Sequence, residues 1–282
     1  MIHAWDVATI WPLMGSFHTN CSCIVSFSGH QGDVTSLTST ADGEFLFSGG
    51  RDHSIRMWNT RSGRCVRHIE DIHSPAGHHR GTITGLYCLQ DDQYLLSASL
   101  DGCVKMYHIM TVMEKESKSL SIDDLLSGFM DNGCEWEVPE EGGDELLSSQ
   151  ALMDSEGILS FILNKDGTKI GVCSTEANLR VYDINSNSEL TLSLACQIRS
   201  HTAIVSCITT NTHSDIVSAS HDHHILITDS ITHCLLWDQC MPFSVNVVIA
   251  LYDVILVAGY DYSVHIMKAL DPSFVFMECL TH

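Results

Sequence analysis

The stretch SGGRDHSIRMWN, residues 48 to 59, reads as the end of one strand, a tight turn and a second strand. Asp52 lies in the turn, and the strand that follows it ends in Trp58-Asn59. The same offset, an acidic residue followed six positions later by an aromatic or bulky residue, recurs along the chain. The five pairs are Asp52/Trp58, Asp101/Tyr107, Glu176/Tyr182, Asp222/Thr228 and Asp261/Met267. The acids are 49, 75, 46 and 39 residues apart. These spacings bracket a repeat of roughly 40 to 45 residues and indicate an insertion in the long interval.

Each repeat has room for four short strands. In the first repeat the expected strands are residues 33 to 39, 44 to 50, 54 to 60 and 64 to 70, separated by the turn signals Asp42-Gly43 and Ser62-Gly63. Regular short strands with no helix between them predict an all-β propeller rather than a parallel α/β sheet. A β-sandwich would not explain the repeated offsets.

The repeats resemble those of the WD40 family, whose signature is Gly-His about 22 residues before the turn Asp and Trp-Asp at the end of the third strand. Gly29-His30 with Asp52 and Trp58-Asn59 matches it, with Asn in place of Asp. In the second repeat His79 has the same spacing to Asp101, although His78 is the residue that directly follows Gly77. His201 precedes Asp222 by 21 residues, and the third and fifth repeats lack the His.

A polar network follows from this arrangement. In an antiparallel four-stranded blade, the turn between strands two and three lies at the same end as the link from the previous blade. The turn Asp can therefore accept a hydrogen bond from the link His. The resemblance implies that this His also meets a Ser or Thr of strand two and, through it, the Trp indole N–H. The candidates for the strand-two position are Ser48 or Gly50, Ser97 or Ser99, and Ser218 or Ser220. A network that recurs in several blades, without a G-x-S-x-G elbow, predicts scaffolding rather than nucleophilic catalysis.

We therefore predict an all-β, WD40-like β-propeller of four-stranded antiparallel blades. It has five full blades plus an N-terminal half blade, and six or seven blades in the complete ring. The expected parts of this single domain are a half blade at 1–28, blades at 29–70 and 77–113, an acidic insertion at 114–156, and blades at 157–197, 198–240 and 241–282. Three explanations of the half blade stay open: the chain is part of a longer propeller protein, a partner chain supplies the missing strands, or divergent sequence hides a closed ring of six.

The insertion holds thirteen acidic residues and two lysines. A capping box at Ser121 and Asp124 precedes an apolar helical face, which predicts a short amphipathic helix. The residues of that face are Ile122, Leu125, Leu126, Phe129 and Met130. This helix either docks into a partner or packs on the propeller itself. We expect the insertion to link strand four of one blade to strand one of the next, and hence to lie at the same face as the His and Asp turns.

The charge balance restricts the partners. With 35 acidic and 14 basic residues the formal net charge is -21, which favours basic protein or peptide partners and disfavours direct binding to nucleic acid or membranes. Twelve cysteines without a Cys-x-x-Cys pair or a signal-peptide pattern predict reduced thiols in the cytoplasm or nucleus. We predict no cofactor and no metal site, and we interpret SHDHHI, residues 220 to 225, as ordinary surface histidines. Residues 244 to 260 are read as two strands rather than a membrane helix.

The predicted function is that of a non-enzymatic WD40-repeat scaffold in a multiprotein complex. Residues 46 to 61 also resemble the motif by which WD40 substrate receptors dock onto the adaptor of cullin-4 ubiquitin ligases, and Arg61 is the one residue there that goes beyond a well-formed blade. One alternative function is thus a ligase substrate receptor. The other is a coat-like or nuclear-pore-like subunit whose open propeller a partner completes. The candidate partner-binding residues are Arg61, Ile122, Leu125, Leu126 and Phe129.

Overall fold

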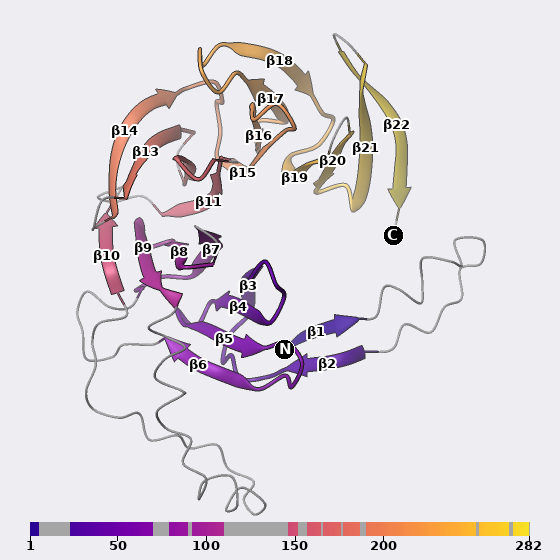
Figure 1. Cartoon of the computed structure of the whole chain (residues 1–282). Helices are drawn as coiled ribbons and strands as arrows, with labels where there is room; N and C mark the ends of the chain where they lie inside the picture. The colour runs from indigo at the N-terminus through magenta and orange to yellow at the C-terminus, as the bar shows by residue number, and fades with distance from the viewer. Residues whose placement is uncertain are drawn as a thin grey trace, which may run out of the picture. The chain divides into compact units, whose positions relative to one another are not determined.

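In the described residues the regular elements are β-strands. The computed structural model describes residues 1–5, 23–69, 79–89, 92–109, 146–151, 157–164, 166–175, 177–186, 190–251, 254–270 and 273–281. Within these ranges the strands form five four-stranded sheets and one two-stranded sheet (Figure 1). The all-β prediction, with five full repeats and one half repeat, is therefore confirmed.

The chain divides into two compact units where the sequence predicted one domain. The first comprises Met1–Ser97 and Lys105–Ser149, and the second comprises Ala98–Val104 and Gln150–His282. Each unit is described by itself.

The first unit begins with the half repeat. Strand β1 (Ile2–Trp5) pairs with β2 (Cys23–Phe27) in an antiparallel sheet of two strands. The next sheet is a meander of β3 (Val34–Ser39), β4 (Phe45–Gly50), β5 (Ile55–Asn59) and β6 (Cys65–Ile69). Its turns contain the expected glycines, since Gly43 and Gly63 both have a φ of +70°, which side chains with a Cβ rarely adopt. The Trp58 side chain is fully buried in this sheet.

The second four-stranded sheet corrects the position of the insertion. Its order is β7 (Ile83–Leu89), β8 (Tyr94–Ser99), β9 (Cys103–His108) and β10 (Leu146–Ala151). The fourth strand thus comes from the end of the segment 114–156, and the insertion connects strands three and four of one sheet rather than two successive sheets. Our prediction was wrong because the five residues 109–113 would have to provide both the turn after β9 and a strand that pairs with it. The strand that pairs with β9 has the sequence LLSSQA.

This correction also changes the edge at which the insertion emerges. In an antiparallel meander the connection between strands three and four lies at the opposite end from the turn between strands two and three. The insertion therefore leaves its sheet at the end opposite to the Asp101 turn, not at the same end as we predicted. The expected helix at residues 121 to 130 lies outside the described residues.

The second unit contains three further meanders. The first is β11 (Ile158–Leu163), β12 (Lys169–Ser174), β13 (Leu179–Ser186) and β14 (Leu190–Ile198). The second is β15 (Val205–Thr210), β16 (Ile216–Ser220), β17 (His224–Thr228) and β18 (Leu235–Cys240). The third is β19 (Val245–Leu251), β20 (Val254–Gly259), β21 (Ser263–Leu270) and β22 (Ser273–Thr281).

Within each unit, the hydrophobic core lies between successive sheets. The second strand of one sheet packs on the first strand of the next, as β16 does on β19, where Val217, Ala219, Val245 and Val248 are almost fully buried. Residues 244 to 260, which could have suggested a membrane span, form β19 and β20. In the part of the chain that the structure describes, no helix is long and apolar enough to span a membrane.

Candidate functional site

A chain of polar side chains crosses the sheet β3–β6. The Trp58 indole Nε1–H donates to Ser48 Oγ at 2.8 Å, and Ser48 Oγ lies 2.6 Å from His30 Nε2. His30 Nδ1 lies 2.8 Å from Asp52 Oδ2. With the proton of His30 on Nδ1, each donor in the series has one acceptor, so the buried polar atoms are all satisfied.

The Ser48 hydroxyl in this chain is not available as a nucleophile. Its side chain is fully buried, and its oxygen is held between the indole and the imidazole. Burial and saturation of the hydroxyl prevent a substrate from approaching it. The arrangement fits a structural function, since a buried polar group left unpaired would cost roughly 1 to 3 kcal/mol.

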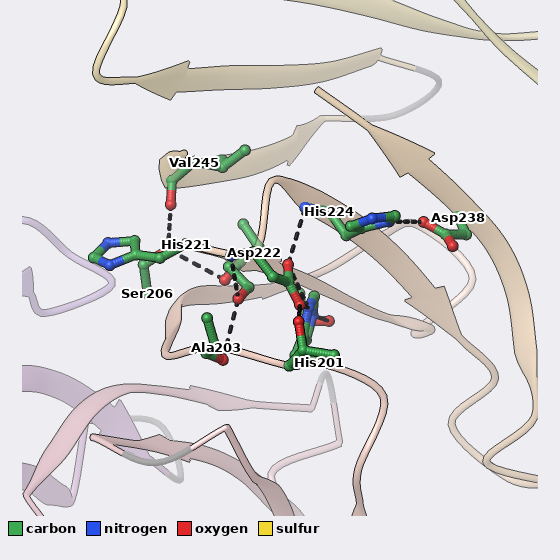
Figure 2. A network of polar contacts seen from close by, with 12 residues as sticks. His201, Ala203, Ser206, His221, Asp222, His224, Asp238 and Val245 are labelled. Carbon is green, nitrogen blue, oxygen red and sulfur yellow. Dashed lines mark hydrogen bonds and ion pairs between the residues drawn. The ribbon is translucent and has the colours of Figure 1, made fainter. Parts of the chain in front are cut away.

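The same network recurs in the sheet β15–β18, whose centre is drawn in Figure 2. His201 Nδ1 lies 3.0 Å from Asp222 Oδ2, and His201 Nε2 lies 2.9 Å from Ser218 Oγ. The position of Trp58 is taken by Thr228, which is buried. Asp222 also accepts from the backbone N–H of Thr202 at 2.8 Å, which ties the link before β15 to the turn after β16.

The second repeat has contacts of the same kind. His79 is buried, and its Nε2 lies 2.7 Å from Ser97 Oγ, while the Asp101 carboxylate accepts from the Cys103 N–H at 3.0 Å. Tyr107 takes the buried aromatic position. His78, the alternative to His79, lies outside the described residues.

The third and fifth repeats differ from this arrangement. Glu176 lies outside the described residues, and Tyr182 is buried. In the fifth repeat Asp261 accepts from His265 Nε2 at 2.5 Å, so a histidine of β21 takes the position of the missing link histidine. Phe243, which precedes β19, stacks on His265 with ring centroids 4.7 Å apart. His265 was not predicted, because in the repeat pattern the partner of the turn Asp lies before the first strand; its spacing of four residues from Asp261 was the available signal.

Hydrogen bonds dominate the electrostatics of the two complete networks. Burial by itself would raise the pKa of Asp52, but hydrogen bonds from His30, the Gln31 N–H and Ser54 hold it well below its usual range. The pKa of Asp222 is lowered in the same way, against burial, by the backbone N–H groups of Thr202 and His224 and by His201. Burial lowers the pKa of His201, which favours the neutral imidazole.

The residue after each turn Asp lies in the left-handed region of φ. The φ values are +66° for His53, +77° for Gly102, +74° for His223 and +61° for Tyr262. Glycine suits such a position, whereas a bulky residue there is strained. Tyr262 is the extreme case, because its side chain is 83% exposed and so gains no packing that would offset the strain.

Exposed side chains gather around the last two of these turns. Tyr260 is 61% exposed, and its ring lies edge-on to His221 with centroids 5.9 Å apart. The His221 N–H donates to the carbonyl of Ile204, whose side chain is also exposed. We call Ile204, His221, Tyr260 and Tyr262 the turn surface. Beside Ile204, an open hollow of about 590 Å³ is lined by Ala177, Asn178, Arg199, His201, Thr202 and Ala203.

The remaining candidates from the sequence are Arg61, the residues of the insertion and the stretch SHDHHI. Arg61 is exposed in the turn between β5 and β6, where its N–H donates to Asn59 Oδ1. Ile122, Leu125, Leu126 and Phe129 lie outside the described residues. The described ranges contain no group of three or more His, Cys, Asp or Glu side chains that could hold a metal ion. In the stretch SHDHHI, His224 pairs with Asp238 at 2.6 Å rather than with the neighbouring histidines (Figure 2).

Comparison with known proteins gives one family and several relatives. Residues 21–59 and 64–108 match the family described as WD domain, G-beta repeat. A segment of 46 residues is 44% identical to the Ribosome biogenesis protein BOP1 homolog of Arabidopsis thaliana, covering 16% of this chain and 6% of that protein. Another of 69 residues is 35% identical to the CCR4-associated factor 4 homolog of Candida glabrata, covering 24% of this chain and 11% of that protein.

A third segment, of 54 residues, is 37% identical to WD repeat-containing protein 18 of Homo sapiens, covering 19% of this chain and 12% of that protein. The matched segments are thus a small part of each relative. The family match covers strands β2 to β5 and β6 to β9, and it coincides with the first His–Ser–Asp network. These matches show that residues 21–59 and 64–108 are WD40-type repeats, and the repeated four-stranded antiparallel sheets are consistent with such repeats along the rest of the described chain.

Proposed function

We propose that this chain is a non-enzymatic scaffold that binds protein partners through its turn surface, within a multiprotein complex of the cytoplasm or nucleus. The observation that carries the proposal is Tyr262. An exposed aromatic residue held at a φ of +61° costs stability, roughly 1 to 2 kcal/mol for a left-handed L-residue. Strain of this kind is typical of residues that are positioned for function.

The chemistry of the surface favours a protein or peptide ligand. Tyr side chains contribute large contact areas at low entropic cost and are enriched in protein interfaces. The net charge of -21 favours a partner with basic residues around the contact and disfavours phosphate-rich ligands. The Ser, His and Asp side chains that could otherwise suggest a hydrolase are used in the buried networks. The name of one relative, a CCR4-associated factor, describes an association with another factor and is consistent with a binding function.

The substitution Tyr262→Gly tests the proposal because it separates binding from folding. Glycine removes the aromatic ring and also relieves the positive φ, so the variant should be at least as stable as the parent protein. We expect the set of proteins that co-purify with the full chain, quantified by mass spectrometry, to lose at least one major partner. Thermal unfolding measured in parallel should show no decrease in Tm.

Ile231→Gly is the matched control. Ile231 is 83% exposed, as is Tyr262, but it lies in the turn between β17 and β18, at the other end of its sheet from the Asp222 turn. Partner binding should survive this change. Equal partner sets for the parent protein and both variants would show that the turn surface does not bind partners.

A further inference from the structure

The last sheet of the second unit has an uncovered apolar face. On β19 the side chains of Val247, Ile249 and Leu251 are 45%, 45% and 49% exposed. They point away from Val245 and Val248, which are buried against the preceding sheet β15–β18. Three large aliphatic side chains in alternating positions of one strand form a continuous apolar strip on this face.

Comparison with the preceding sheet shows what is missing. The strand registers make Val217 and Ala219 of β16 equivalent to Leu256 and Ala258 of β20. Val217 and Ala219 have no exposed surface because β19 covers them, whereas Leu256 and Ala258 are only half-buried. On the third strands, Ile225 and Ile227 are buried while their equivalents Val264 and Ile266 are again half-buried.

A recurrent hydrogen bond indicates what covers such a face. The second residue of the first strand lies in a bulge at Thr35 and again at Ser206. Ser206 Oγ donates to the carbonyl of Val245, the first residue of the next sheet, at 2.7 Å (Figure 2), and Thr35 donates in the same way to Ile83, the first residue of β7. Asn246 occupies the same bulge in β19, and its amide can donate an equivalent bond. In the described part of the chain, no sheet follows to accept it.

The sequences of β19 and β20 are typical of strands that are covered on both faces. Strands with one solvent face alternate apolar and polar residues, whereas strands buried on both faces read as continuous apolar runs. The outer strand β14, which begins LTLSL, is of the first kind. VNVVIAL and VILVAG are of the second kind, because Asn246 is their only strongly polar residue.

Among the described residues of the first unit, the same element is absent. The sheet β1–β2 has two strands where the others have four. Leu37 of β3 is 50% exposed, although its equivalents Ile208 and Val248 are buried against the inner strands of the preceding sheet. The missing element in both cases is an inner pair of strands. The inner pairs Val34–Gly50, Val205–Ser220 and Val245–Gly259 span 15 to 17 residues.

We propose that the face of β19–β22 binds a β-hairpin of about this length from a partner protein, by strand packing on Val247, Ile249 and Leu251. The first strand of the hairpin contributes aliphatic residues to the contact, and its first carbonyl accepts from Asn246. The negative charge of the chain favours basic residues beside the hairpin. This site is separate from the turn surface, and its test does not depend on that proposal.

The test uses the full chain and a defined probe. The probe is a fluorescently labelled peptide of residues 34 to 50, which form an inner pair of strands in this chain. Its two strands are joined by a polar turn that contains Asp42-Gly43. Fluorescence anisotropy should show saturable binding. Ile249→Asp should weaken it at least tenfold, which corresponds to about 1.4 kcal/mol, and Asn246→Ala should weaken it several-fold. Leu236→Asp, a change at a 56% exposed leucine of the outer strand β18, should leave it unchanged.

Three results would overturn the proposal. They are no saturable binding, equal binding by the Ile249→Asp variant, and a dimer in light scattering that Ile249→Asp dissociates, since the dimer would mean that a second copy of this chain covers the face. Circular dichroism of each variant verifies folding. Tyr262→Gly should not affect binding of the probe, so failure of one proposal is distinguishable from failure of the other.

Discussion

Replacement of Ser48 by Ala isolates the energetic contribution of the buried network in the sheet β3–β6. The hydroxyl accepts from Trp58 Nε1–H and lies 2.6 Å from His30 Nε2. Alanine leaves both ring nitrogens without this partner. Trp58 has no exposed surface and the His30 side chain is 2% exposed, so water cannot readily replace the hydroxyl.

The magnitude follows from these two unpaired groups. A buried polar atom that loses its partner costs about 1 to 3 kcal/mol, and removal of the serine hydroxyl recovers part of its own desolvation penalty. We therefore expect the free energy of unfolding of this sheet to decrease by about 2 to 4 kcal/mol. Ser39→Ala, at an exposed position of β3, should change it by less than about 0.5 kcal/mol.

Hydrogen–deuterium exchange with mass spectrometry measures this loss locally, in peptides from β4 and β5. Peptides from β15–β18, which belong to the other unit, serve as the internal reference. The double variant Ser48→Ala/Trp58→Phe then completes a double-mutant cycle, and a coupling energy of about 0.5 to 3 kcal/mol is expected for residues in one network. A Ser48→Ala effect no larger than that of Ser39→Ala, together with zero coupling, would refute the reasoning.

Two further predictions concern the same networks. Trp58→Ala should destabilise the sheet β3–β6 by about 3 to 5 kcal/mol, as expected for truncation of a fully buried aromatic side chain; a change below about 1 kcal/mol in urea unfolding would contradict the observed packing. The free energy of unfolding should also decrease as the pH is lowered. His201, whose pKa is below its ordinary 6.5 in the folded chain, resists protonation there, so stability falls from about pH 6.5 downward. The lowered pKa values of Asp52 and Asp222 add stability above their ordinary 3.8 that is lost below it. Asp52→Asn should reduce this second fall, and a pH-independent free energy between pH 3 and pH 7 would exclude both contributions.

The local geometry was predictable where one short stretch contains its own partners. Residues 33 to 70 specify four strands through their alternation and turn signals, and the structure places them within one residue of the expected bounds. Spacing along the chain also predicted that His30 and His201 meet Asp52 and Asp222. His265 was not predictable in this way. Its contact with Asp261 comes from a strand residue, whereas the repeat pattern places the histidine in the link before the first strand.

The position of the insertion shows a second limit of the sequence. A repeat length reveals that about 30 residues are extra, but it does not say between which strands they lie. The pairing of β9 determines where the extra residues lie. The free edge of β9 can pair with any later segment that can form a strand, and it pairs with β10 after a long connection. Loop-closure entropy grows slowly with length, so the detour costs little more than a short hairpin turn. The connection that contains the acidic segment and the Asp101 turn, which we expected at one end of the sheet, are thereby attached at opposite ends.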